Sequence, residues 1–234
     1  METDTFQVGQ WLRGRIYERR CDLSPHGEYF IYFALDGRWE SEVKGSWTAI
    51  SRSPYLKAIA LWSKGDGWNG GGLFISDKSY WLNDGPYGHK EFLKTKELKK
   101  DKWLPSQEYG GECPGVYYHR LQRDGWVIKS TTRSEVVFER PFTSNLILRK
   151  IAHQTIDHPV GTGCYFDEYE LIHKKPKRHQ FFSGWEWADI DGDRIVFVEN
   201  GKLWELKQIG GKLNQPKLLF DGNQLVYKRI KAPY

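Results

Sequence analysis

The sequence predicts an all-β protein made of about five four-stranded antiparallel units. Aromatic residues make up 15% of the 234 residues, with 11 Trp, 13 Tyr, 12 Phe and a single Met, which favours pleated and half-buried surfaces over helical bundles. Apolar runs of strand length alternate with short segments rich in Gly, Pro, Asn and Asp. One stretch, residues 185–221, contains four such runs in succession. Together these observations indicate an antiparallel fold built from hairpins.

The stretch 185–221 is the clearest unit. Its expected strands are Trp187–Ile190, Arg194–Val198, Lys202–Leu206 and Pro216–Phe220. Asp191-Gly192-Asp193 and Asn200-Gly201 supply the positive-φ positions that tight hairpins need. A four-stranded sheet of this size leaves both faces apolar, so it needs similar units packed against it.

Two further units are expected in the first third of the chain. The first places a strand at 29–35 after the turn Ser24-Pro25-His26-Gly27. The second has expected strands at 47–52, 55–62, 72–76 and 79–83. Between its second and third strands lies the Gly-rich loop 65–71, which is longer than a hairpin requires, and overlong loops tend to carry function.

The remaining units are less regular. Residues 85–115 break the pattern and are expected to form a surface insertion with one short helix within 88–103. The third unit has expected strands at 116–121, 126–130, 135–139 and 145–151, and the fourth at 164–172 and 180–183. We expect residues 224–230 to pair back with the N-terminal region, so that residues 1–234 form a single domain.

The first unit carries the residues of a known repeat. Asp22, Ser24, Pro25, Gly27, Ile31 and Phe33 match the pattern D-x-S-P-x-G-x-x-x-I-x-F. In this respect the chain resembles TolB-type, WD-repeat-like β-propeller proteins; the second and fifth units match only in part, and the third and fourth depart from the pattern. The resemblance implies a small propeller of about five blades, in which ring closure avoids exposed strand edges. It also implies a scaffold for recognition, although the fold alone does not choose a function.

In a propeller, the loops at one face surround the central channel, and this face is where we expect a ligand. The candidate ligand-binding residues there are Arg38, Trp39, Asp66, Trp68, Trp185 and Glu186. The same face would collect Arg19, Arg20, Lys44, Trp47 and Arg133. Aromatic rings beside charges suit a polar ligand with flat faces or a protein side chain. Most large aromatic residues serve packing instead, but Trp68 lies in the Gly-rich loop and is the exception that we expect.

Motifs for catalysis, metals and cofactors are weak, and the sequence predicts none of these. The Gly-rich loop lacks the Gly-Lys-Ser/Thr ending of a phosphate-binding loop. Asp189, Asp191 and Asp193 resemble the start of a calcium loop, but the Gly lies at the wrong position and no bidentate Glu follows at the required distance. His153, His158 and Cys164 match no zinc signature. An alternative is a hydrolase that acts on a glycan or peptide at the channel mouth with carboxylates drawn from Asp66, Glu168 and Glu186.

A second alternative is nucleic-acid binding through basic loops. Lys174, Lys175, Lys177 and Arg178 lie at an expected hairpin tip, and residues 90–102 are also rich in lysine. A solvated loop explains both stretches equally well, and the net charge of +5 is mild for this length.

The sequence also bears on location. The N-terminal residues contain no apolar stretch of signal-peptide length, and no run approaches the length that spans a bilayer. Three cysteines at wide spacings, Cys21, Cys113 and Cys164, fit reduced thiols. We therefore expect a cytoplasmic binding or protein-interaction module with a protein or small polar ligand as partner and no membrane partner.

Overall fold

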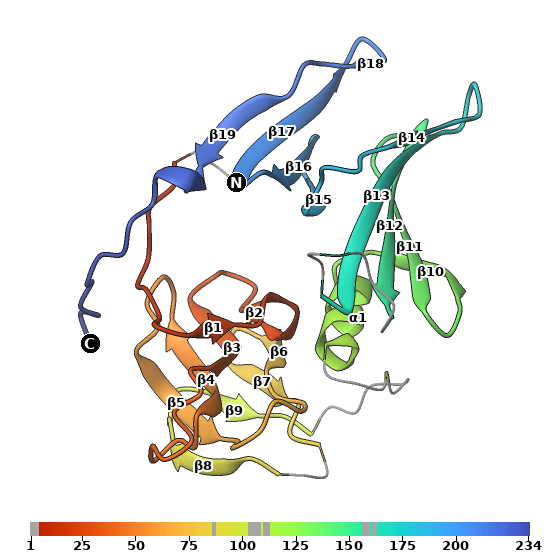
Figure 1. Cartoon of the computed structure of the whole chain (residues 1–234). Coiled ribbons are helices and arrows are strands. Elements are labelled where there is room, and N and C mark those ends of the chain that lie inside the picture. The colour runs from red at the N-terminus through yellow and green to blue at the C-terminus, as the bar shows by residue number, and fades with distance from the viewer. Residues whose placement is uncertain (1–4, 86–87, 103–108, 110–112, 156–159, 161–162) are drawn as a thin grey trace. The chain divides into compact units, whose positions relative to one another are not determined.

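A computed structural model describes residues 5–85, 88–102, 109, 113–155, 160 and 163–234 (Figure 1). The prediction of an all-β protein is confirmed, because almost every regular element is a strand. The chain divides into two compact units, whereas the sequence predicts one domain. The N-terminal unit comprises Gln7–Arg123 and Tyr227–Tyr234, and the C-terminal unit comprises Asp124–Val226 with the described residues of Met1–Phe6. No closed ring of blades is found among the described residues, so the propeller stays a prediction.

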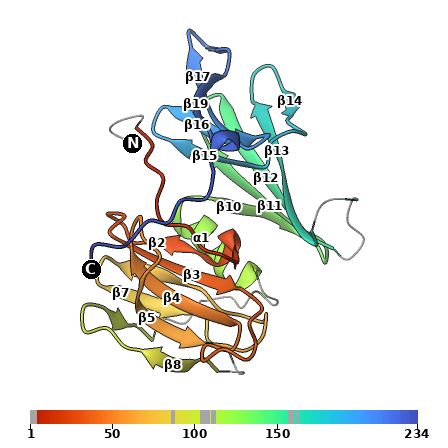
Figure 2. The same cartoon turned by 60° about the vertical axis from the view of Figure 1, so that its left-hand side comes forward.

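The N-terminal unit contains two sheets. The larger has the order β1-β3-β4-β5-β8, with β2 also paired to β3, and its strands β2, β3, β4, β5 and β8 are labelled in Figure 2. The smaller has the order β6-β7-β9 (Figure 1). The strands of the larger sheet are β1 (Arg15–Ile16), β2 (Asp22–Leu23), β3 (Tyr29–Leu35), β4 (Ser46–Arg52), β5 (Ala58–Ser63) and β8 (Lys90–Leu93). Those of the smaller are β6 (Gly72–Ser76), β7 (Ser79–Leu82) and β9 (Lys99–Lys100). The short 3-10 helix η1 (Glu18–Arg20) precedes β2, and the helix α1 (Pro114–Arg123) ends the first part of this unit.

Both faces of the larger sheet of the N-terminal unit are covered by apolar side chains. On one face, Ile31, Ile50 and Trp62 form a core with Phe74 and Leu82 of the smaller sheet. On the other face, a second cluster contains Cys21, Tyr32, Ala34, Trp47 and Ala49. The central strand β3 therefore has inward-facing residues on both sides, which explains its nearly continuous apolar sequence.

The C-terminal unit also contains two main sheets. The first has the order β10-β11-β12-β13-β14, and the second has the order β15-β16-β17-β18 with β19 also paired to β17 (Figure 1). The strands of the first are β10 (Val127–Thr131), β11 (Glu135–Pro141), β12 (Leu146–Gln154), β13 (Tyr165–His173) and β14 (Arg178–Phe181). Those of the second are β15 (Trp187–Asp191), β16 (Arg194–Glu199), β17 (Lys202–Ile209), β18 (Lys212–Leu213) and β19 (Lys217–Asp221), followed by the 3-10 helix η2 (Gly222–Gln224).

A row of alternating charges crosses the first sheet of the C-terminal unit, from β11 to β14. Arg149 of β12 donates to Glu139 of β11 at 2.9 Å and to Glu170 of β13 at 2.5 Å. Glu170 in turn lies 3.0 Å from Nδ1 of His179 on β14. Glu170 is only 1% exposed, so these partners compensate for the loss of water around its carboxylate.

The structure corrects the sequence prediction between residues 88 and 123. Residues 116–121, predicted as a strand, belong to the helix α1, in which Val116, Tyr117 and Leu121 are buried. The β-branched and aromatic composition suggested a strand, but packing of the helix on its neighbours overrides that propensity. Conversely, the helix predicted within 88–103 is wrong for the described residues, because Lys90–Leu93 and Lys99–Lys100 are strands paired with β5 and β7.

Of the segment 224–230, residues 227–230 return to the N-terminal region, but as irregular chain instead of a strand. The Gln10 amide donates to the Ile230 carbonyl at 2.9 Å, and the rings of Trp11 and Tyr227 meet edge to face at 6.2 Å. Further along, the Tyr234 hydroxyl accepts the Arg52 backbone N–H at 3.0 Å. The last eight residues thus complete the N-terminal unit.

Candidate functional site

Four of the six candidate ligand-binding residues meet at one end of the N-terminal unit. Arg38 and Trp39 lie in the loop between β3 and β4, and Asp66 and Trp68 lie in the Gly-rich loop 65–71 between β5 and β6. Ser46, at the start of β4, joins the two loops, because its hydroxyl donates to the Asp66 carbonyl at 2.7 Å. We call this group of two loops the tryptophan end.

The Gly-rich loop has a backbone that most residues cannot adopt. Gly65, Asn69, Gly70 and Gly71 have φ values of 81°, 52°, 88° and 76°. At Gly71 a Cβ atom would lie 2.0 Å from the carbonyl oxygen of Arg20. The glycines are therefore required by the positive φ and by close packing on the chain beneath.

Arg20 holds the Gly-rich loop from below. Arg20 is 0% exposed, and its Nη1 donates to the carbonyls of Gly67 at 2.7 Å and Asn69 at 2.5 Å. The guanidinium also lies over the rings of Tyr17 and Phe33, 4.8 Å from each centroid. A buried cation is costly unless it is hydrogen-bonded, and here the loop carbonyls and the ring faces compensate.

Other side chains fix the remaining parts of the loop. The Thr48 hydroxyl accepts the Gly71 N–H at 2.8 Å, and the Asn83 amide donates to the Gly70 carbonyl at 3.2 Å. The Asp66 carboxylate accepts the Trp68 N–H at 2.8 Å and forms an ion pair at 2.8 Å with Lys64, whose side chain is fully buried. The loop is thus held in one conformation along its length.

Each of the two loops exposes one tryptophan, Trp68 from the Gly-rich loop and Trp39 from the β3–β4 loop. Trp68 is 59% exposed and Trp39 is 48% exposed, so the expected exception of Trp68 from core packing is confirmed. Two of the nearby charges are engaged within the protein, since Arg38 pairs with Asp36 at 2.5 Å and Asp66 pairs with Lys64. Glu40, Glu42 and Lys44 of the β3–β4 loop are exposed, so this end presents aromatic rings beside charges.

His89 lies under the same loops and makes the N-terminal unit sensitive to acid. Its Nε2 is 3.2 Å from the Thr48 hydroxyl, and burial, reinforced by the positive charge of Lys64, lowers the pKa of His89 to about 4. The unfolded chain, with a His pKa of about 6.5, takes up the proton first as the pH falls. The stability that the N-terminal unit gains from a neutral His89 is therefore complete above about pH 6.5 and is lost progressively towards pH 4.

Between pH 7 and pH 5, the free energy of unfolding of the wild-type N-terminal unit should fall by about 1–2 kcal/mol more than that of a His89→Gln variant. The difference arises because glutamine at position 89 cannot take up a proton. Urea unfolding of both proteins at the two pH values measures this difference. Parallel pH profiles for wild type and variant would contradict the assignment to His89.

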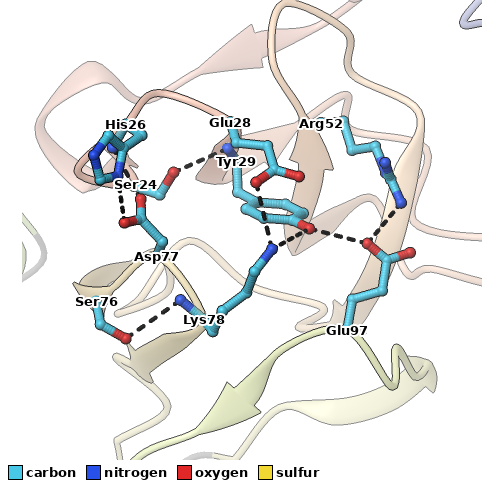
Figure 3. A network of polar contacts seen from close by, with 9 residues as sticks. All are labelled: Ser24, His26, Glu28, Tyr29, Arg52, Ser76, Asp77, Lys78 and Glu97. Atoms are coloured by element: carbon cyan, nitrogen blue, oxygen red, sulfur yellow. Dashed lines mark hydrogen bonds and ion pairs between the residues drawn. The ribbon is translucent and has the colours of Figure 1, made fainter.

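A second polar network joins the turn before β3 to the β6–β7 turn (Figure 3). His26 Nδ1 lies 2.5 Å from the Asp77 carboxylate, and Lys78 Nζ lies 3.1 Å from the Tyr29 hydroxyl, which contacts Glu97 at 3.1 Å. An imidazole oriented by a carboxylate also occurs in hydrolytic sites, where it activates a nucleophile.

The surroundings of this network favour a structural role. The Ser24 hydroxyl accepts the Tyr29 N–H at 3.1 Å, and among the described residues no hydrogen bond joins this hydroxyl to His26. Burial raises the pKa of the Tyr29 phenol, so it stays protonated at neutral pH and is not a base. The contacts connect the two sheets of the N-terminal unit through their turns.

The other two candidate ligand-binding residues, Trp185 and Glu186, belong to the C-terminal unit. Trp185 is 6% exposed, and its ring is stacked between Phe182 at 3.9 Å and Phe197 at 4.3 Å. Glu186 is exposed, and its backbone N–H donates to the Val198 carbonyl at 2.8 Å. Trp185 is thus a packing residue, the role that most tryptophans have.

The basic residues form a hairpin tip, as predicted. Lys174, Lys175 and Lys177 are exposed in the turn between β13 and β14, and Arg178 begins β14. The Asn145 amide donates to the Lys175 carbonyl at 2.9 Å and ties this turn to the neighbouring β11–β12 turn.

Thr48, Asn83 and His89 support the tryptophan end but were not predicted. Each is a lone polar residue in or beside a strand, and its role depends on a contact with a distant loop. No group of three His, Cys, Asp or Glu side chains that could hold a metal ion occurs among the described residues. In the same part of the chain, no helix has the length and apolar character needed to cross a membrane.

Comparisons of the chain with protein-family models, with curated protein sequences and with solved structures find no match. The candidate site therefore has to be interpreted from its own geometry.

Proposed function

We propose that this protein is a non-catalytic protein-interaction module whose tryptophan end binds a partner protein. The observation that carries the proposal is an exposed Trp68 on a loop that buried side chains hold in one conformation. A surface residue of this kind loses little conformational entropy on binding, because the loop is already ordered.

The chemistry of the tryptophan end favours a protein over a sugar as the partner. Tryptophan and arginine are the residue types that contribute most to protein interfaces, and this end exposes Trp39, Trp68 and Arg38. A sugar site needs several polar groups directed at the ligand. Here the Asp66 carboxylate is already engaged by Lys64 and by the Trp68 N–H.

Two sequence features support the same class of function. The resemblance of residues 22–33 to TolB-type repeats points to a scaffold for recognition, within a propeller-like arrangement of blades. The three free cysteines suit a reducing compartment, and we propose that the protein acts in the cytoplasm.

The proposal predicts that Trp68→Ala weakens partner binding by about 30-fold or more, which corresponds to about 2 kcal/mol for a central interface tryptophan. A photoreactive benzoylphenylalanine at the exposed position 42, in the loop that carries Trp39, would capture the partner in the cells of origin. The captured protein is then purified, and its affinity for wild type and Trp68→Ala is measured by calorimetry.

Phe92→Ala provides the matched control, because Phe92 is 51% exposed on β8 of the same unit. It should leave the affinity unchanged. The melting temperature of Trp68→Ala should stay near that of wild type, because more than half of Trp68 is exposed. Capture that yields no partner, or a partner that binds Trp68→Ala as tightly as wild type, would refute the proposal.

A further inference from the structure

A cleft opens between the two sheets of the C-terminal unit. Its volume is about 540 Å³, which is within the size range of small-molecule sites. One wall is the face of β14 that carries Arg178 and Gln180, and the opposite wall is the face of β16 and β17 that carries Phe197 and Leu206. This cleft is separate from the tryptophan end, which belongs to the other unit.

Part of the lining of the cleft is apolar. Phe182, Trp185, Phe197 and Leu206 contribute to it. Because Phe182 and Phe197 cover the two faces of Trp185, only the edge of that ring is available to a ligand. A ligand would therefore place an apolar body beside this stack and not insert a ring against Trp185.

Two cations at the cleft lack an opposite charge. Among the described residues, no carboxylate lies within ion-pair distance of Arg178 or of Lys212, although both line the cleft. The neighbouring cations of the second sheet behave differently, since Arg194 pairs with Glu205 at 2.6 Å and Lys207 pairs with Asp193 at 3.4 Å. Glu199 is the single carboxylate among the described residues that line the cleft, whereas the lining has these two cations.

The closest contacts of the Arg178 guanidinium are weak. They are the ring of His173 at 3.4 Å and the side-chain oxygen of Gln180 at 3.5 Å. These distances lie at the limit for hydrogen bonds, so the guanidinium keeps most of its capacity to bind a planar anion through two parallel N–H groups.

We infer that this cleft binds a small amphipathic carboxylate, with its anionic group at Arg178 and Lys212 and its apolar body against Phe182 and Leu206. The basic hairpin tip beside the cleft, with Lys174, Lys175 and Lys177, would attract such an anion over a longer range. Single-stranded nucleic acid fits less well, because it binds through stacking on open aromatic faces and both faces of Trp185 are covered.

Calorimetric titration of the full-length protein with two pairs of probes tests this inference. The pairs are 2-naphthoate with 2-naphthamide, and decanoate below its micelle concentration with decanamide. Within each pair the shapes match and only the charge differs. At least one carboxylate should bind at least tenfold more tightly than its amide, and the difference should shrink as salt is added.

Two variants locate the binding site. Arg178→Gln/Lys212→Gln should abolish the preference for the carboxylate, and both side chains are exposed, so the variant should fold. Phe182→Ala should weaken both members of a pair by a similar factor. Lys129→Gln is the matched control, since Lys129 lies on the far edge strand β10 with Glu139 as its partner at 3.8 Å. This variant should leave the affinities for all four probes unchanged.

Three results would overturn the inference: no binding by either carboxylate, equal affinities within both pairs, or a preference that persists in the double variant. A ten-nucleotide oligothymidine is titrated in parallel. If it binds in a manner that depends on Arg178 and Lys212 while both carboxylates fail to bind, the cleft is a nucleic-acid site instead.

Discussion

Replacing Arg20 with methionine is expected to lower the free energy of unfolding of the N-terminal unit by about 2–4 kcal/mol. Methionine fills much of the same space but leaves the carbonyls of Gly67 and Asn69 without their donor. Each partly buried carbonyl that loses its hydrogen bond costs about 1–3 kcal/mol, less where water can reach it. Urea unfolding followed by circular dichroism measures the loss.

Hydrogen exchange gives a more local measurement of the same change. The Gly71 N–H, which donates to Thr48, should lose protection in Arg20→Met well before the amides of β3 do. Arg38→Met is the control, because Arg38 is exposed and its pair with Asp36 is expected to contribute less than about 1 kcal/mol. Equal stabilities of Arg20→Met and Arg38→Met would show that the loop does not depend on Arg20.

The second large effect is expected at Asp22, where Asp22→Ala should destabilise the N-terminal unit by about 3 kcal/mol. Asp22 is 4% exposed, and its carboxylate accepts two hydrogen bonds from Arg123 of α1, at 2.6 Å and 2.9 Å. It also accepts the backbone N–H of Phe74 on β6 at 2.8 Å. Removal of the carboxylate leaves the buried Phe74 N–H without an acceptor and removes the hydrogen bonds that join α1 to β2.

Asp22→Asn separates these contributions. The amide oxygen still accepts the Phe74 N–H, but the charged pair with Arg123 is lost, so Asp22→Asn should be less destabilising than Asp22→Ala. Thermal unfolding of the three proteins at pH 7 measures both differences. The explanation fails if Asp22→Ala unfolds within about 0.5 kcal/mol of wild type.

Most strands could be predicted from the sequence because their signals are local. β3 at Tyr29–Leu35 and β6 at Gly72–Ser76 match the expected ranges, and the four strands of 185–221 are each shifted or extended by a few residues at most. Gly192, Asn200 and Gly201 have φ values of 59°, 53° and 70°, as the hairpin turns require. Turn residues and the alternation of apolar with polar residues can be recognised within about ten residues, so these strands can be predicted without tertiary information.

What could not be predicted depends on distant contacts. Residues 114–123 form a helix because its buried face packs in the N-terminal unit, and Arg20 holds a loop about 50 positions away. Similarly, the sequence shows that short sheets must stack, but it does not show which sheets share a unit. The same limit applies to the site: Trp68 was recognised from its loop, whereas Trp185 has equally polar neighbours in sequence and is buried by Phe182 and Phe197.

The division of the chain between its units has a consequence for synthesis and for cleavage. The polypeptide passes from one unit to the other three times, near residues 6, 123 and 226. On the ribosome, the N-terminal unit must wait for the whole of Asp124–Val226 before Tyr227–Tyr234 can reach Trp11 and Arg52. A protease that cuts any one of these connections leaves two covalent links in place, so a single nick does not set either unit free.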